Sequence, residues 1–183
     1  KLRQIYEEAL NCDGVVGLSI ATRPDCIAPE LYPYLGELAK RTYLTVELGL
    51  QSAHNATLSR INRGHTFECF CEAHRLLKQH GVRTCVHLIN GLPGEAFKDM
   101  LQTAKLVGKE NPSAVKLHLL HIMEGTALAN QYRNGEFEEM SQSEYVKTVC
   151  EQLCYFSPET VIERITGDGS KQRLIAPKWS LNK

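Results

Sequence analysis

The chain has 183 residues, of which 43% are hydrophobic and 23% charged, and its formal net charge is zero. This composition is typical of a globular domain with a sizeable core, and a neutral chain gives no electrostatic reason to expect binding to nucleic acid or to a membrane. The seven cysteines are odd in number and scattered, and the sequence contains no signal peptide or long apolar run. We therefore expect free thiols in a cytoplasmic protein without a membrane partner.

Short β-rich runs alternate with longer amphipathic segments along the chain. Strands are predicted at residues 15–21, 43–50, 84–90, 114–120 and 160–166, and helices at residues 2–10, 29–40, 66–80, 95–109 and from Ser141 towards Phe156. The strands begin roughly 30 to 40 residues apart, which is the period of βαβ units. This pattern predicts one α/β domain with a mainly parallel sheet.

Local signals mark several ends of these elements. Pro29 suits a first helical turn, Gly81 suits the residue after a helix, and Ser141-x-x-Glu144 is a capping box. The Gly-Asp-Gly sequence at residues 167–169 indicates a turn. We expect the tail beyond it, which holds Trp179, to pack back on the domain.

The predicted strands carry polar or small side chains on one face, although most parallel strands are apolar on both. In residues 43–51 the apolar positions 44, 46, 48 and 50 alternate with Thr45, Glu47, Gly49 and Gln51. Residues 15–23 repeat the alternation and place Gly17, Ser19, Ala21 and Arg23 on one face. In residues 114–120, Lys116 and His118 share a face, whereas in residues 84–91 the positions His87 and Asn90 have opposite parity.

Two interpretations of this polar face are open. A ligand in the mouth of a curved sheet would satisfy these groups, and several of them lie late in their strands, at the end where parallel α/β folds bind ligands. The alternative is an internal salt-bridge network of Arg23, Glu47 and Lys116, which would cost much desolvation energy for little stability.

Two loops carry motifs that are weak on their own. The Gly-Leu-Pro-Gly-Glu sequence at residues 91–95 lies between a strand and a helix, where the backbone could approach a ligand closely. A plain strand-to-helix turn is the more common explanation. In the Asn-Arg-Gly-His sequence at residues 62–65, Arg63 could bind a carboxylate bidentately, or could simply be solvated.

Metal chelation by this chain is not expected, because its cysteines lack the spacing of a zinc or cluster site. The closest ones form two pairs, four and two residues apart: Cys150 with Cys154, and Cys69 with Cys71. We interpret these cysteines as core residues. His118 and His121 differ in strand parity, so we expect them to point to opposite faces.

Taken together, these segments resemble radical S-adenosylmethionine (SAM) enzymes related to the catalytic subunit of Elongator. The segments that look like barrel strands three to six, with their loops, are residues 17–25, 46–52, 61–65, 87–95 and 116–121. The tail at residues 167–183 looks like one bacterial subgroup whose reaction is unassigned. The resemblance implies a partial (β/α)6 barrel of the TIM type, with residues 1–183 as a single incomplete domain of strands three to six plus a C-terminal extension.

The resemblance also implies two cofactors. A [4Fe–4S] cluster, held by three cysteines of a C-x3-C-x2-C loop, would bind SAM and cleave it to a 5′-deoxyadenosyl radical that abstracts hydrogen from a substrate. That motif is absent from this sequence, which begins at Lys1 rather than Met. We therefore expect a fragment truncated at its N-terminal strands, without the cluster and without turnover, whose cluster cysteines lie upstream.

The resemblance suggests which residues contact SAM. Gln51 and Arg63 look like contacts to its ribose and carboxylate ends. Glu47 and Arg23 face the same lumen, and His87 falls where the fifth strand approaches the ribose or adenine. No catalytic residue is assigned.

The remaining contacts concern the adenine and the substrate. Gly91 and Pro93 would shape the adenine side of the SAM pocket, whereas Lys116 and His118 would face the substrate. The Elongator-like resemblance makes tRNA a candidate substrate, although the neutral charge gives it no support, and a small molecule or a protein is equally open.

Other functions remain as alternatives. The chain could be a non-catalytic α/β module that binds a nucleotide or a partner. It could also be a barrel enzyme that needs no cluster, such as a lyase, with Glu47 and either Lys116 or His118 as its acid–base pair. Whatever the function, truncation would expose the edge of the strand at residues 15–21, so we expect the fragment to self-associate.

Overall fold

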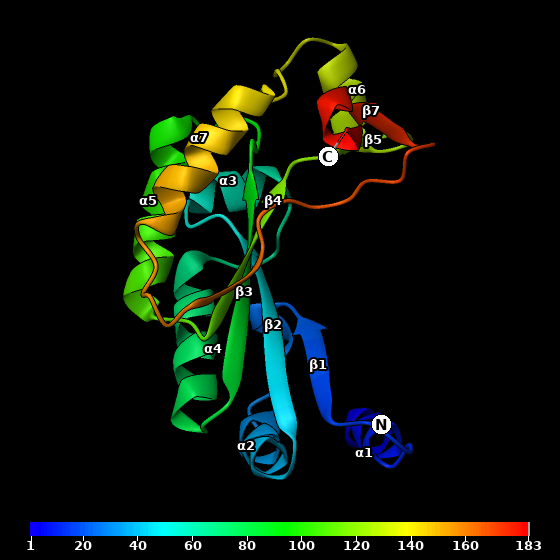
Figure 1. Cartoon of the computed structure of the whole chain (residues 1–183), viewed down its shortest axis with the longest axis vertical. Coiled ribbons are helices and arrows are strands. Elements are labelled where there is room, and N and C mark those ends of the chain that lie inside the picture. Colours follow the sequence, from blue (N-terminus) through cyan, green and yellow to red (C-terminus); the bar gives the residue numbers. More distant parts are fainter. Residues whose placement is uncertain (183) are drawn as a thin grey trace.

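The computed structural model of the chain describes residues 1–182. Within them, a five-stranded sheet has the order β1-β2-β3-β4-β6, and every neighbouring pair is parallel. Its strands are β1 (Gly17–Thr22), β2 (Tyr43–Gln51), β3 (Arg83–Asn90), β4 (Ala114–Leu119) and β6 (Val161–Arg164). A short antiparallel pair, β5 (Ile122–Met123) with β7 (Leu174–Ala176), lies beyond the end of β4 (Figure 1). The predicted α/β class with a mainly parallel, unclosed sheet is confirmed.

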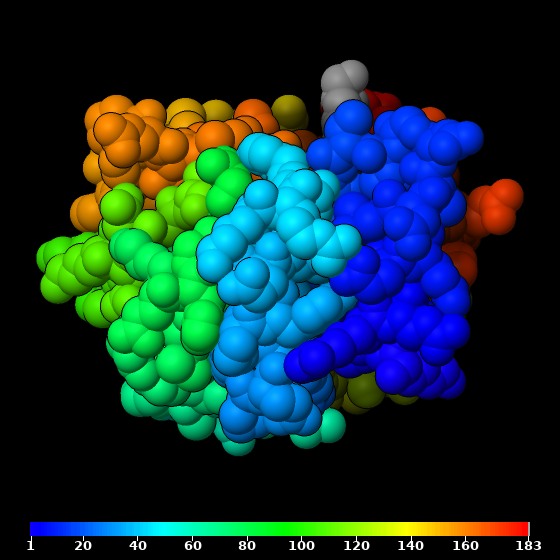
Figure 2. All heavy atoms as spheres, turned by 90° about the horizontal axis from the view of Figure 1, so that it is seen from below, coloured from blue at the N-terminus to red at the C-terminus, as the bar shows by residue number. Residues whose placement is uncertain are grey.

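Helices cover one face of this sheet. The helices are α1 (Leu2–Leu10), α2 (Leu31–Arg41), α3 (Asn55–Arg60), α4 (Phe67–Gln79), α5 (Phe97–Glu110), α6 (Ala127–Arg133) and α7 (Gln142–Leu153), with 3-10 turns η1 (Pro24–Cys26) and η2 (Lys178–Leu181). Figure 1 shows α4, α5 and α7 stacked along the same side of the strands. Seen from below in Figure 2, the N-terminal segments and the orange segments near residue 160 lie on opposite sides, as expected when β1 and β6 form the two edges of the sheet. No helix within residues 1–182 is long and apolar enough to cross a membrane.

The core lies between the sheet and these helices. Leu44, Val46, Leu48 and Leu50 of β2 are all at most 1% exposed, whereas the residues between them are partly exposed. The same alternation holds in β4, where Val115, Leu117 and Leu119 are buried. The apolar face predicted from strand parity therefore packs against the helices, and the polar face points away from them.

Several boundaries differ from the prediction. Pro29 lies in a turn, because α2 begins only at Leu31. The prediction that the paired cysteines belong to the core is wrong for Cys150 and Cys154, which are exposed. Cys69 and Cys71 are partly buried, and Cys71 packs against the core. The buried stripe of α7 consists of Tyr145, Thr148, Val149 and Gln152, so Cys150 falls outside it, and Cys154 follows the helix as its C-cap residue.

The C-terminal tail docks on the domain as predicted. The Trp179 ring lies 5.8 Å from the Tyr145 ring, and its indole Nε1 donates a hydrogen bond of 2.9 Å to the carbonyl of Met140. Ala176 of β7 packs with Ile122 of β5 and Ala129 of α6 in a small second core, and Leu174 of β7 is also buried. The tail thus fixes the segment that precedes α7.

The capping box at the start of α7 gives a direct stability prediction. Ser141 accepts from the backbone N–H of Glu144, whose carboxylate accepts from the N–H of Ser141 at 2.9 Å. Replacing Ser141 with Ala should lower the free energy of unfolding by about 1 kcal/mol in urea titrations, because it leaves a helical N–H unsatisfied. The neighbouring exposed Gln142→Ala should change it by less than about 0.5 kcal/mol. Equal effects of the two substitutions would show that the cap does not stabilise the helix.

Candidate functional site

A cluster of polar side chains crosses the middle of the face opposite the helices. We call it the polar-face cluster, and its members come from every strand of the main sheet: Ser19, Glu47, His87, Lys116, His118 and Glu163. Parallel pairing brings them together, because Ser19 lies beside Thr45, and His87 lies between Gly49 and Lys116. The face that strand parity predicted to be polar is therefore a continuous array.

Glu47 is the centre of this cluster. Its Oε2 lies 2.6 Å from Lys116 Nζ and 2.6 Å from His87 Nε2, and its Oε1 accepts from Ser19 Oγ at 2.5 Å. Lys116 Nζ also lies 3.2 Å from Glu163 Oε2. The side chains of Glu47 and Lys116 are each only 15% exposed, so the pair is shielded from water and its geometry is well defined.

The charge state of Glu47 follows from these contacts. Burial alone would favour the neutral acid, but hydrogen bonds from Lys116, Ser19 and His87 outweigh it and lower the pKa of Glu47 to about 2. Burial likewise opposes the charge on Lys116, yet the two carboxylates raise its pKa. Near neutral pH the pair is ionised, so Glu47 is a poor proton acceptor.

Two histidines stack beside the ion pair. The rings of His87 and His118 are 5.3 Å apart at an angle of 29°. Burial lowers the pKa of His87, and burial together with the neighbouring His87 and Arg164 lowers the pKa of His118 to about 4. Both rings are therefore neutral at pH 7. Since ionised Glu47 can only accept, His87 carries its proton on Nε2 and leaves Nδ1 as an acceptor.

His118 has an unused ring nitrogen. Its Nε2 is buried and has no hydrogen-bond partner within residues 1–182. The prediction that His118 and His121 point to opposite faces is wrong. Both imidazoles approach Gly167, where an added Cβ would lie 3.1 Å from His118 Nδ1 and 3.6 Å from His121 Cε1. β4 ends at Leu119, so strand parity no longer applies to His121.

The buried neutral His118 predicts an acid-sensitive stability. Its folded pKa lies below the unfolded value of 6.5, so the unfolded chain binds the proton first and stability falls as the pH drops from 6.5 towards 4. Between pH 7 and 5 the His118 contribution to the free energy of unfolding should change by about 2 kcal/mol. In urea titrations, the free energy of unfolding of His118→Gln should fall less steeply with decreasing pH than that of the wild type. Identical pH dependence of the two proteins would contradict a buried, neutral His118.

A second group gathers at the carboxyl ends of β1 and β2. We call Arg23, Asp25, Gln51 and Arg63 the arginine cluster. Arg23 binds Asp25 through Nε at 3.0 Å and Nη2 at 2.6 Å. Arg63 donates through Nε to the carbonyl of Gly49 at 3.0 Å, and burial followed by the nearby Arg23 lowers its pKa.

Glycines make room for these guanidinium groups. A Cβ on Gly49 would collide with the Arg63 guanidinium and lie 3.0 Å from Gln51 Nε2, and a Cβ on Gly64 would lie 3.4 Å from Arg23. Gln51 itself has a left-handed φ of 80°, at a register shift between β2 and β3. Such strain in a non-glycine residue is typical of functional sites. Two guanidinium groups facing one carboxylate leave an excess positive charge here.

The predicted salt-bridge network is only partly formed. Glu47 and Lys116 pair as proposed, but Arg23 pairs with Asp25 instead. Arg23 follows β1 as the N-cap residue of η1, and its partner Asp25 lies two residues further on, within η1. Glu163 was missed, although the strand predicted at residues 160–166 contained it; a register shift between Val115 and Lys116 brings it to Lys116.

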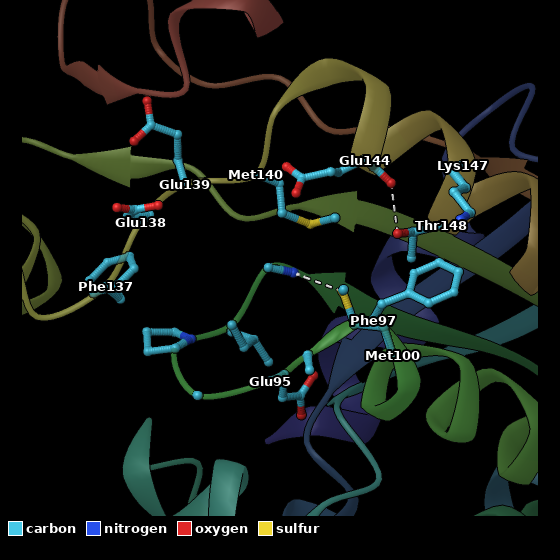
Figure 3. A pocket seen from close by; sticks show the side chains of 15 residues that line it. Glu95, Phe97, Met100, Phe137, Glu138, Glu139, Met140, Glu144, Lys147 and Thr148 are labelled. Carbon is cyan, nitrogen blue, oxygen red and sulfur yellow. Dashed lines mark hydrogen bonds between the residues drawn. The ribbon is translucent and has the colours of Figure 1, made fainter.

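Gly91 and Pro93 lie apart from both clusters. They line a pocket of about 560 Å³ with the starts of α5 and α7 (Figure 3). Gly91 has a φ of 86°, its N–H donates to Met100 Sδ, and the Pro93 carbonyl accepts from Arg60 at 2.6 Å. In the described part of the chain, no group of three or more His, Cys, Asp or Glu residues could hold a metal ion.

Comparisons with known proteins agree over the whole chain. The model of the radical SAM superfamily matches residues 2–107, and the model of the radical SAM C-terminal domain matches residues 112–183. The chain is 49% identical to the uncharacterized protein YtqA of Bacillus subtilis, covering 100% of this chain and 56% of that protein. It thus spans little more than half the length of this curated relative.

One further relative is named for a reaction on tRNA, and one solved structure is similar to this chain. The tRNA uridine(34) acetyltransferase of Methanocaldococcus infernus is 32% identical over 73% of this chain and 25% of its own length. The solved structure of Elp3 from the same archaeon superposes with a TM-score of 0.78 at 28% identity, over 87% of this chain and 38% of that one.

Proposed function

Because this chain belongs to the radical SAM superfamily, we propose that the protein of which it is part cleaves SAM reductively and uses the product radical on a substrate. The observation that carries the proposal is the family match over residues 2–107 together with the polar face and the arginine cluster inside that range. When bound, a [4Fe–4S] cluster and SAM supply the radical chemistry. The residues of this chain bind and orient SAM and shield the site from water.

The described residues suit the chemical groups of SAM. The excess positive charge of Arg23 and Arg63 over Asp25 matches the SAM carboxylate. Gln51 offers an amide to the ribose hydroxyls, and the space left at Gly49 keeps this corner open to a ligand. Glu47 and His87, already fixed by Lys116 and Ser19, form the adjoining wall.

The [4Fe–4S] cluster needs cysteine ligands at a spacing that residues 1–183 do not contain. No C-x3-C-x2-C motif occurs in this sequence, and the chain covers only 56% of YtqA. We therefore assign the cluster ligands to a part of the protein outside residues 1–183. Gly91 and Pro93 remain proposed neighbours of the adenine, through the loop backbone after β3 rather than through side chains.

The substrate would lie against Lys116 and His118. Neutral His118 has an unused buried Nε2, which suits a hydrogen bond to a polar substrate group. The similarity to a tRNA uridine(34) acetyltransferase favours a tRNA nucleoside as the first substrate to test. The cluster-free lyase is less well supported, because the ion pair with Lys116 keeps Glu47 ionised with a pKa of about 2.

The function is tested on the whole protein, purified without oxygen and with its iron–sulfur cluster reconstituted. After addition of SAM and dithionite, we expect 5′-deoxyadenosine by mass spectrometry, and none after replacement of the cluster cysteines. Added tRNA should increase its yield if tRNA is the substrate. A protein with a full cluster that forms no 5′-deoxyadenosine, with or without tRNA, would contradict the proposal.

We also propose that residues 1–183 expressed alone self-associate through β1. β1 is an edge of the described sheet, and Val16 just before it is 87% exposed. Light scattering should show dimers or larger species whose fraction grows with concentration. Val16→Lys should reduce that fraction, whereas Val161→Lys on the opposite edge should not. A fragment that stays monomeric at all concentrations would contradict this proposal.

A further inference from the structure

The pocket in Figure 3 lies between the beginnings of α5 and α7, outside both clusters described above. Its volume of about 560 Å³ is in the range of small-molecule sites. Residues 91–96 close one side and residues 137–140 the other. None of the residues that line it belongs to the polar-face cluster or to the arginine cluster.

The walls of this pocket include aromatic and thioether side chains. Figure 3 shows Phe97 and Phe137 on opposite sides, with Met140 between them and Met100 beside Phe97. The ammonium of Lys147 lies 5.0 Å from the centre of the Phe97 ring. The chain thus already holds one cation on an aromatic face of the pocket, and such faces attract ammonium groups.

The charged side chains of the rim are mostly acidic. Four glutamates and a single cation, Lys147, line the pocket: Glu95, Glu138, Glu139 and Glu144. Glu144 is engaged in the α7 cap, and Glu139 accepts from Tyr132 Oη at 2.5 Å. Glu138 is exposed, and its carboxylate has no hydrogen bond or ion pair in the described part of the chain. An anion would be repelled here, whereas a cation could form an ion pair with the Glu138 carboxylate.

We propose that this pocket binds a small organic cation: a primary ammonium carried on an aromatic or aliphatic body. The body lies between Phe97 and Phe137, and the ammonium reaches Glu138 at the rim. The pocket shares Gly91 and Pro93 with the proposed adenine side of the SAM site, but Phe97, Phe137 and Glu138 belong to neither cluster. The amine therefore binds without the iron–sulfur cluster and without SAM. Lys147 competes with the ligand for the Phe97 ring.

Trp179 reports on this pocket. It is the only tryptophan of the chain, and its Nε1 donates to the carbonyl of Met140, which lines the pocket. The probe is 2-phenylethylammonium, and the matched neutral compound is 2-phenylethanol. Equilibrium dialysis with the radiolabelled amine measures binding directly, and Trp179 emission locates it.

One amine per chain should bind at pH 7 with a Kd on the order of 1 mM, with a saturable change in Trp179 emission. The alcohol should bind at least about fivefold more weakly, and Glu138→Gln should weaken amine binding by about the same factor. Lys147→Gln should instead tighten it by about threefold, because the ring is freed. Glu159→Gln, outside the pocket, is the control.

Three results would overturn the proposal: no amine bound at 10-fold above the expected Kd, an alcohol that binds as tightly as the amine, or amine binding that is unchanged in both Glu138→Gln and Lys147→Gln. The first two would leave an apolar hollow without cation recognition. The third would place the bound amine elsewhere on the chain.

Discussion

Replacing Glu47 with Leu is expected to lower the free energy of unfolding by about 2 to 3 kcal/mol. The substitution removes the carboxylate that lies 2.6 Å from both Lys116 Nζ and His87 Nε2. It leaves the Lys116 ammonium, only 15% exposed, with Glu163 as its remaining partner at 3.2 Å. That second carboxylate is why we expect the lower end of the range seen for broken buried pairs. Urea titrations at pH 7 measure the change.

A double substitution separates the value of the pair from the cost of breaking it. Glu47→Leu with Lys116→Met removes both charges and should recover stability to within about 1 kcal/mol of wild type. Glu163→Leu alone should cost less than about 1 kcal/mol, since its side chain is 33% exposed. If the double variant loses as much free energy of unfolding as the two single variants together, Glu47 and Lys116 are not coupled. Recovery would mean that the ion pair is not needed for stability, which favours its use in a binding site.

Replacing Arg63 with Ala in the whole, cluster-loaded protein is expected to reduce the kcat/KM for SAM cleavage by about 10- to 100-fold. The guanidinium is held by the Gly49 carbonyl beside Arg23 and Gln51, so it is positioned before a carboxylate arrives. Loss of a binding contact should appear mainly in KM. Arg63→Lys should keep part of the affinity, because it preserves the charge but not the planar fork.

The matched control for Arg63 is Arg75→Ala. Arg75 is also an arginine near the surface, but it pairs with Glu72 on α4, away from the strand ends. It should leave the SAM kinetics unchanged. A SAM affinity that is the same for Arg63→Ala, Arg75→Ala and wild type would remove Arg63 from the site.

Strand parity was sufficient to predict the main sheet and its polar face. The alternation in β2 separates buried Leu48 from Glu47, and the same rule places Lys116 on the face of Glu47. The prediction failed where the chain leaves regular structure. His121 follows the end of β4, Glu163 arrives through a register shift, and Arg23 found a nearer partner in Asp25.

The prediction that Cys150 and Cys154 belong to the core failed for another reason. A helix position is buried only if it falls on the stripe that packs against the rest of the domain. Cys150 lies one residue beyond that stripe of α7, and Cys154 follows the helix as its C-cap residue. The pocket beside Phe97 was not foreseen either, because its lining joins residues 91–100 to residues 137–148. No local pattern links those two segments before the tail, through Trp179, fixes the position of Met140.

We propose that SAM lies against the arginine cluster and against Glu47 and His87 of the polar-face cluster. Hydrogen–deuterium exchange of the whole, cluster-loaded protein, with and without SAM, tests it most directly. We expect SAM to slow exchange in peptides that cover the end of β2, residues 62–65 and residues 87–95, and to leave α7 unchanged. Protection confined to other segments, with SAM bound, would contradict the account.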